Sequence, residues 1–177
     1  MNQKYVITGG PGTGKTSIIR ELSNRNFFCV KENAREIVFS RDNKVDKLSS
    51  YIHYENKISD LRTKSYAITP NNQICFFDRS VFDCLAYLKI KKIEASSQIK
   101  KNIKTCIFNK KLFFTPFWAE IYKNDKVRIE SIIEAKKIEK TLLETYKSFG
   151  FKPIIIPKDK VSKRVDFIIS YLNLKKK

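Results

Sequence analysis

Residues 9–16, near the start of the chain, have the composition of a phosphate-binding loop. They read Gly-Gly-Pro-Gly-Thr-Gly-Lys-Thr and match the pattern G-x-x-x-x-G-K-[ST] without a mismatch. Glycines allow the tight turn in which successive backbone N–H groups point at a phosphate, at the start of the following helix. Lys15 is expected to reach the β- and γ-phosphates, and Thr16 to ligate Mg²⁺. The sequence therefore predicts a site for ATP or GTP formed by Gly9, Gly10, Pro11, Gly12, Thr13, Gly14, Lys15, Thr16 and Ser17.

An aspartate follows the apolar run 74–77, at the end of the third predicted strand. A buried strand that presents Asp78 at its carboxyl end has the form of a Walker B element, which holds Mg²⁺ directly or through water. In an open parallel sheet the ligand crevice lies at this edge, so Asp78 is expected close to Thr16. Capping of the next helix is an alternative role for Asp78. Thr16 and Asp78 are the predicted metal ligands.

Further charged residues follow the second and third strands. Glu32 could accept the proton of a substrate hydroxyl, and Arg35, one helical turn later, could steady a charged acceptor. An acid at a helix start, paired with a nearby base, explains Glu32 equally well. Asp83 lies one turn beyond Arg79 and could pair with it or face the acceptor, while an ordinary surface charge is an equal alternative. The candidate acceptor-binding residues are Glu32, Arg35, Arg79 and Asp83.

Short apolar runs alternate with helix-like stretches along the chain. Five strands separated by helices predict an α/β fold of three layers, in which a mostly parallel sheet is covered on both faces. A final amphipathic helix is expected after the fifth strand, and Gly150 is expected to cap the long helix before it. The predicted strands are 4–8, 27–31, 74–77, 111–115 and 153–156, and the predicted helices are near 16–25, 34–40, 48–67, 81–90, 94–107, 129–149 and 161–172.

The composition excludes several classes of protein. With 177 residues, of which 42% are hydrophobic, the chain can bury the core of one domain, 1–177. It contains no run of about 18 apolar residues, and we expect a cytoplasmic protein. The four cysteines include no C-x-x-C pair, and His53 is the single histidine. A zinc site built from histidines and a Ser-His-Asp relay are therefore both disfavoured.

The net charge of +18 is the most unusual property of the composition. A strongly basic chain is typical of proteins that bind nucleic acids. The basic residues are scattered along the chain, however, and most are lysines, which are the common solvated surface cations. We therefore favour a general surface property over a polyanionic partner. The basic tail 173–177 is expected to fray after the last helix.

Taken together, these residues resemble those of the P-loop AAA-domain proteins grouped with NadR-type ribosylnicotinamide kinase domains. The resemblance covers nearly the whole chain and depends on an ordered set of short motifs. Two residues depart from the family pattern: Phe117 stands where a second proline is common, and Ser80 where a glycine is common. The motifs are the loop 9–16, Glu32-x-x-Arg35, Phe77-Asp78-Arg79 with Asp83 and Tyr87, the run 113–118, Asn124-Asp125 with Arg128, and Ile156-Pro157 with the run 161–164.

The resemblance implies a kinase-like active site with a mobile lid at about 117–131. In related kinases such a lid brings an arginine onto the transferring phosphoryl group, and Arg128 is the candidate here, with a plain helix-surface arginine as the alternative. The resemblance also places Pro157 beside the nucleotide base, although a simple strand-to-helix turn fits this position as well. Lys15, Asp78, Glu32 and Arg128 are then the catalytic candidates.

The function expected from the sequence is Mg²⁺-dependent transfer of the γ-phosphate of ATP or GTP to a hydroxyl of a small nucleoside-like metabolite. One alternative is a regulatory NTPase whose output is a contact with a partner. Another is a polynucleotide kinase or a nucleic-acid-binding ATPase. The identity of the acceptor, the choice between ATP and GTP, and the oligomeric state have no readable signal in the sequence.

Overall fold

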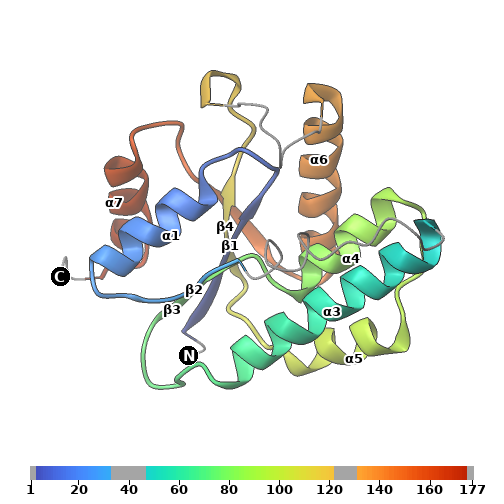
Figure 1. Cartoon of the computed structure of the whole chain (residues 1–177). Helices are drawn as coiled ribbons and strands as arrows, with labels where there is room; N and C mark the ends of the chain where they lie inside the picture. The colour runs from blue at the N-terminus through green and yellow to red at the C-terminus, as the bar shows by residue number, and fades with distance from the viewer. Residues whose placement is uncertain (1–2, 33–46, 122–130, 175–177) are drawn as a thin grey trace.

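The structure of the chain is a computed structural model that describes residues 3–32, 47–121 and 131–174. At its centre, five parallel strands form a sheet in the order β2-β3-β1-β4-β5 (Figure 1). The predicted α/β fold and all five predicted strands are confirmed, with ends that differ by at most one residue. The strands are β1 (Lys4–Gly9), β2 (Phe28–Val30), β3 (Cys75–Asp78), β4 (Lys111–Thr115) and β5 (Lys152–Ile155).

Helices cover both faces of the sheet (Figure 1). One face carries α1 and α7, which also contact each other. The opposite face carries α4 and α6, and α3 and α5 pack against α4. Among the residues described, no helix combines the length and the apolar composition that a membrane span requires. The helices are α1 (Lys15–Asn24), α3 (Lys47–Ala67), α4 (Val81–Ile90), α5 (Ser97–Thr105), α6 (Ile132–Ser148) and α7 (Val161–Tyr171), with a 3-10 turn, η1 (Ala119–Ile121), after β4.

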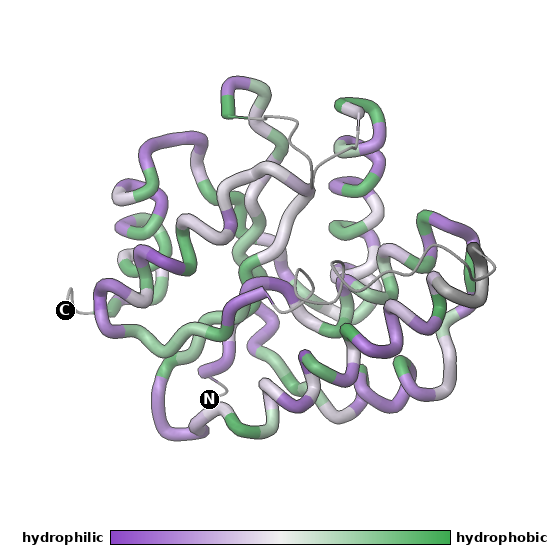
Figure 2. Tube along the Cα trace, in the orientation of Figure 1, coloured by the Kyte–Doolittle hydropathy of each residue, from purple (hydrophilic) through white to green (hydrophobic). Residues whose placement is uncertain are grey.

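The central strands β1, β3 and β4 are largely apolar because both of their faces are buried, whereas the edge strands β2 and β5 are partly exposed. On β1, Val6 points into the core beneath α4 and α6, while its neighbour Ile7 points into the core beneath α1 and α7. On β3, Phe77 likewise points into the core beneath α4 and α6, and Phe76 into the core beneath α1 and α7. Parallel sheets covered on both sides are typically coded by such continuous apolar runs. The helices instead mix hydrophilic and hydrophobic residues, as Figure 2 shows, because each has one face toward water.

Capping residues determine where several helices begin and end. Ser96 accepts a hydrogen bond from the backbone N–H of Ile99, so α5 begins at residue 97 and the predicted start at 94 is too early. Ser131 and Ser80 begin α6 and α4 through capping boxes. Gly150 follows α6 with a φ of 77°, which confirms the predicted left-handed cap. The predicted helix 34–40 lies outside the described residues.

Candidate active site

The phosphate-loop sequence connects β1 to α1 at the carboxyl edge of the sheet. Gly9 must be a glycine because β4 lies against it: an added Cβ would lie 2.2 Å from Oγ1 of Thr115 and 2.3 Å from its carbonyl oxygen. Gly14, the residue before α1, has a φ of 81°, in the left-handed region that glycine adopts without strain. The loop therefore depends on glycine both for its own turn and for its fit against β4.

Two side chains from distant parts of the chain brace this loop. The Thr13 hydroxyl donates to the carbonyl of Gly10 at 3.0 Å and shares a 2.6 Å hydrogen bond with the Thr115 hydroxyl of β4. From α7, Arg164 donates to the carbonyl of Thr13 at 3.0 Å. Both Thr13 and Arg164 are buried. The shape of the loop is thus set by β4 and α7 as well as by its own glycines.

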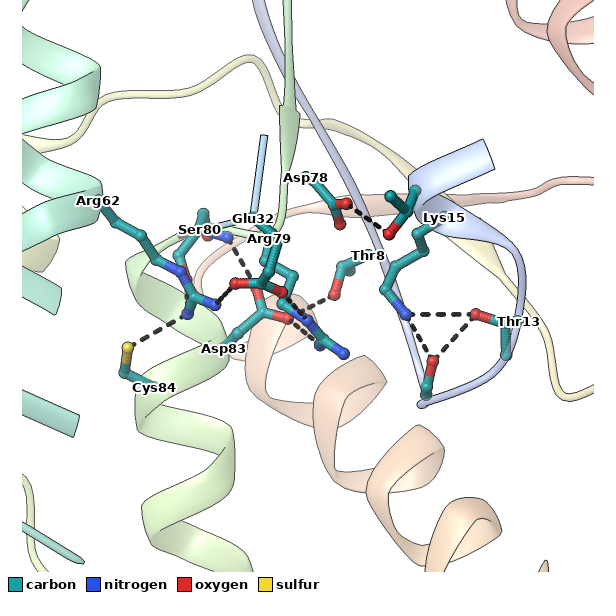
Figure 3. A network of polar contacts seen from close by, with 12 residues as sticks. Thr8, Thr13, Lys15, Glu32, Arg62, Asp78, Arg79, Ser80, Asp83 and Cys84 are labelled. Carbon is teal, nitrogen blue, oxygen red and sulfur yellow. Dashed lines mark hydrogen bonds and ion pairs between the residues drawn. The ribbon is translucent and has the colours of Figure 1, made fainter. Parts of the chain in front are cut away.

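Lys15 lies folded over the loop that precedes it. Its Nζ donates to the carbonyl of Gly10 at 2.5 Å and to Oγ1 of Thr13 at 3.4 Å (Figure 3). Burial, followed by the positive charge of Arg79, lowers the pKa of Lys15 to about 7 against the opposing attraction of nearby carboxylates. A buried amine with backbone and hydroxyl partners, and with no carboxylate in contact among the described residues, is positioned to receive an anion such as a phosphate.

Asp78 and Thr16 lie together, as predicted from the parallel sheet. The Thr16 hydroxyl donates to Oδ2 of Asp78 at 3.2 Å. The other carboxylate oxygen, Oδ1, is buried and has no hydrogen-bond partner in the described part of the chain, and burial raises the pKa of Asp78. An orphaned carboxylate oxygen next to a threonine hydroxyl is the hard-oxygen donor pair that Mg²⁺ prefers. In the part of the chain described, no cluster of three or more acidic, cysteine or histidine side chains could hold a metal by itself, so a cation here needs further ligands from a phosphate or water.

Glu32, just after β2, is clamped between two arginines (Figure 3). Its Oε1 lies 2.7 Å from a terminal nitrogen of Arg62 on α3, and its Oε2 lies 2.6 Å from Nε of Arg79 after β3. Burial alone would raise the pKa of Glu32, but the charges of Arg62 and Arg79 outweigh it, and the pKa is lowered. The carboxylate is therefore charged and held in one orientation.

Asp83 on α4 is the centre of a second set of contacts. It has no exposed surface, so the alternative of an ordinary surface charge is wrong. Its carboxylate accepts hydrogen bonds from Thr8 at 2.6 Å, Arg79 at 2.9 Å, the backbone N–H of Ser80 at 2.9 Å and the Tyr146 hydroxyl at 2.5 Å. The expected pairing of Asp83 with Arg79 is confirmed. Burial opposes ionisation, but Arg79 and Arg62 prevail, and the pKa of Asp83 is lowered.

Arg79 joins these two carboxylates with an uncommon backbone conformation. Its φ is 70°, in the left-handed region that residues other than glycine seldom adopt. The conformation is stabilised by the ion pairs to Glu32 and Asp83, and by a hydrogen bond from its N–H to the carbonyl of Ile7 at 3.0 Å. Such backbone outliers are typical of functional sites. Arg79 therefore ties the ends of β1, β2 and β3 together beside the phosphate loop.

A family model described as an AAA domain matches residues 4–164. The chain belongs to this AAA-domain family. No curated protein matches its sequence. The matched segment runs from the start of β1 to Arg164 on α7, so it contains every described side chain of the site. The expectation of an AAA-domain protein is confirmed.

Solved structures of kinases share the fold of this AAA domain. The NadR protein in complex with NR aligns with 99% of the chain at 19% identity and a TM-score of 0.73. The chain covers 53% of NadR and therefore spans about half of the length of that relative. Deoxyadenosine kinase from M. mycoides, with dCMP and dCDP bound, aligns with 96% of the chain and 98% of its own length at 16% identity and a TM-score of 0.71. Thymidylate kinase from Ehrlichia chaffeensis aligns with 96% of the chain and 98% of its own length, at 14% identity and a TM-score of 0.63. At these identities the likeness shows the fold.

Of the remaining predicted site residues of the AAA domain, two are exposed to solvent and two lie outside the described residues. Ser17 is exposed on α1, and Pro157 is exposed in the connection between β5 and α7. Arg35 and Arg128 lie outside the described residues, as does most of the segment 117–131. At the start of that segment, the N–H of Phe117 donates to Glu139 on α6 at 2.6 Å.

Sequence reasoning missed several side chains that build the site, above all Arg62, Tyr146, Thr115 and Arg164. For Arg62 a signal existed: it follows Glu55, Ile58 and Ser59 at helical spacing, and those three are buried. A charged residue on the buried stripe of a helix indicates an internal ion pair. No comparable signal marks the other three, because their partners are set by the packing of distant elements.

Proposed function

We propose that this AAA-domain protein is a Mg²⁺-dependent phosphotransferase that moves the γ-phosphate of ATP or GTP to a hydroxyl of a small nucleoside-like metabolite. The observation that carries the proposal is the Glu32 carboxylate, held by Arg62 and Arg79 close enough to Lys15 to influence its pKa. A phosphate loop alone fits any NTPase. A fixed carboxylate across from the loop adds a group that can bind an acceptor hydroxyl.

The donor nucleotide would be held on the phosphate-loop side of the site. Lys15 leaves the Gly10 carbonyl to contact the β- and γ-phosphates, and the loop N–H groups, Ser17 included, surround the β-phosphate. Thr16 and Asp78 would hold Mg²⁺, which would neutralise part of the charge on the phosphates. Pro157 lies beside the base. These assignments are supported by the orphaned oxygen of Asp78 and the buried amine of Lys15.

The acceptor would lie on the side of Glu32. Its hydroxyl oxygen forms a bond to the γ-phosphorus while the bond from that phosphorus to the β–γ bridging oxygen breaks, and the nucleoside diphosphate leaves. Because its pKa is lowered, Glu32 is a weak base and acts mainly by orienting the hydroxyl before it accepts the proton. In a loose transition state, positioning of this kind accounts for most of the catalysis.

The other charged residues are proposed either to contact the ligands or to hold other residues in place. Arg35 and Arg79 would bind a charged acceptor, and Arg128, in the proposed lid, would close over the γ-phosphate. Asp83 acts as a positioning residue, because its carboxylate has no exposed surface and accepts four hydrogen bonds within the protein. A nucleoside-like acceptor is supported by the fold: NadR was solved with NR, and deoxyadenosine kinase with dCMP.

The proposal is tested by following the transferred phosphate. Protein, Mg²⁺ and γ-labelled ATP or GTP are incubated with nicotinamide riboside, nucleosides, nucleoside monophosphates or an oligonucleotide with a free 5′-hydroxyl. Label on one small acceptor, abolished in Lys15→Ala, supports the kinase. Label only in free phosphate indicates a regulatory NTPase, and label on the oligonucleotide indicates a polynucleotide kinase.

A second variant separates acceptor chemistry from nucleotide binding. Glu32→Gln keeps the size of the side chain and removes its charge, so transfer should fall by about 100-fold. Nucleotide affinity should stay within about threefold of the parent, because the variant leaves the phosphate loop intact. An equally active Glu32→Gln protein would remove Glu32 from the mechanism.

A further inference from the structure

Arg164 is a buried cation that touches the back of the phosphate loop. It lies on α7 with 2% of its surface exposed, and one terminal nitrogen donates to the carbonyl of Thr13 at 3.0 Å. The other terminal nitrogen packs so close to Gly14 that an added Cβ there would lie 2.6 Å from it. Its guanidinium carbon is 5.9 Å from the ring centre of Trp118, beyond the end of β4. The guanidinium is thus enclosed by the loop, α7 and Trp118.

Unlike the other buried arginines of the site, Arg164 has no carboxylate partner among the described residues. Arg62 and Arg79 each contact a carboxylate, and nearby negative charges raise the pKa of both well above the usual value. The pKa of Arg164 is lowered instead, with burial as the cause, and its Nε is buried with no hydrogen-bond partner from the residues that the structure describes. An unpaired buried charge is unfavourable unless a counter-charge arrives.

The contact between Arg164 and the Thr13 carbonyl also determines which way the loop presents its next N–H group. In a trans peptide the C=O and the N–H point in opposite directions. A hydrogen bond that draws the Thr13 carbonyl toward α7 therefore turns the N–H of Gly14 away from α7. In a phosphate loop, N–H groups with this orientation converge on the bound anion.

We propose that Arg164 is a positioning residue for the donor nucleotide. It places a positive charge behind the phosphate loop, and a bound polyphosphate compensates that charge. It also fixes the orientation of the Thr13–Gly14 peptide. This inference rests on nucleotide binding within the proposed function, but on neither the acceptor nor the transfer step. The ligand it recognises is the polyphosphate chain, so its contribution grows with the charge of the nucleotide.

The test measures the affinities of ATP, ADP and AMP for the full chain and for Arg164→Met, which keeps much of the side-chain length and removes the charge. Trp118 is the single tryptophan, and its fluorescence reports binding next to Arg164. We expect the variant to bind ATP and ADP about tenfold or more weakly, with a clearly smaller loss for AMP, because the missing interaction scales with phosphate charge. Equal losses for all three nucleotides, or no loss, would overturn the proposal.

Two further variants separate charge from packing. Arg25→Met removes another arginine that links α1 to α7, through Asp166 at 2.6 Å, without touching the loop, and the ratio of ATP to AMP affinity should stay within about twofold of the parent value. Arg164→Lys keeps the charge and should keep that ratio within about threefold. If Arg164→Met does not fold, the lysine variant decides: a tenfold or larger fall in its ratio overturns the proposal.

The outcomes also distinguish this inference from the proposed function. A parent protein that binds ATP but transfers no phosphate to any acceptor contradicts the kinase, while the comparison of Arg164 variants remains valid. A parent protein that binds no nucleotide overturns both.

Discussion

Glu32 and Arg79 meet at 2.6 Å although one follows β2 and the other follows β3. The pair is completed by Arg62, which reaches the second oxygen of Glu32 from α3 at 2.7 Å. Because the two arginines occupy both oxygens, the carboxylate is fixed and charged before any ligand is bound. The side of the site that we propose for the acceptor is therefore preorganised by ion pairs, and the side proposed for the donor nucleotide by the braced phosphate loop.

Removal of Arg62 should destabilise the protein and change how it responds to acid. Arg62→Met leaves Glu32 with one partner in a buried setting, and the free energy of unfolding should fall by about 3 kcal/mol at pH 7. Since Arg62 helps to lower the pKa of Glu32 and of Asp83, these groups stabilise the parent above their ordinary pKa of about 4. That stabilisation is lost as the pH falls through the lowered values in the folded protein.

Urea unfolding at pH 7 and at pH 3 measures both effects. The difference in stability between the two pH values should be smaller in Arg62→Met than in the parent. Lys100→Met, which breaks the exposed pair with Glu94, is the matched control and should change little at either pH. A variant as stable as this control would contradict a structural role of the clamp.

The hydroxyl of Tyr146 is expected to stabilise the buried carboxylate of Asp83. Tyr146→Phe removes the donor to Asp83 and the contact with the Ser80 hydroxyl at 2.6 Å. Loss of a hydrogen bond to a buried charged group should lower the free energy of unfolding by about 2 kcal/mol. Urea denaturation provides the measurement, and Tyr171→Phe, at a half-exposed ring on α7, should have less than a quarter of the effect.

Gly9 should tolerate no side chain. In Gly9→Ala the new Cβ would meet two Thr115 atoms at 2.2 and 2.3 Å, one of them backbone, so β4 and the loop cannot both keep their positions. We expect ATP affinity to fall by more than about 100-fold, or the protein to lose stability, because the loop geometry is displaced. Gly150→Ala is the control: its φ is 77° with nothing within 4 Å of the added Cβ, so about 1 kcal/mol of stability is lost while ATP binding is kept. Calorimetric titration and thermal melting distinguish the two.

Nucleotide affinity should fall as the pH rises above neutrality. In the free protein the pKa of Lys15 is about 7, so the amine loses its charge above that value. Phosphates raise the pKa in the complex, and binding above pH 7 therefore takes up a proton. The dissociation constant for ADP should increase by up to about tenfold per pH unit until the pKa of the complex is reached.

Calorimetric titrations at pH 8 in buffers of different ionisation enthalpy count the protons taken up. Uptake should vanish at pH 5.5, where Lys15 is already charged, and in Lys15→Arg, whose guanidinium stays charged throughout. A dissociation constant that is flat from pH 6 to pH 9 would contradict the lowered pKa of Lys15.

The phosphate loop, the five strands and the neighbourhood of Thr16 and Asp78 could be predicted from the sequence. The loop motif is contiguous, so its residue types and spacing can be recognised within one short segment. The strands are continuous apolar runs because both faces of the sheet are covered. Asp78 is the last residue of β3, and Thr16 lies in the first turn of the helix that follows β1; these parallel strands end at the same edge of the sheet. For these features, the information lies within a short segment or in a general rule of the fold.

The clamp on Glu32, the four donors to Asp83 and the bracing of the loop by Thr115 and Arg164 were decided by the tertiary structure. These contacts join residues separated by 30, 63, 102 and 151 positions. They depend on β3 lying between β2 and β1 and on α7 packing against α1, and hydrophobic periodicity specifies neither. Asp83 illustrates the difference: its sequence position fitted a surface charge, and only the packing of α6 over α4 placed it in the core. Periodicity shows which face of an element is buried, but the partner that covers that face is chosen by the whole fold.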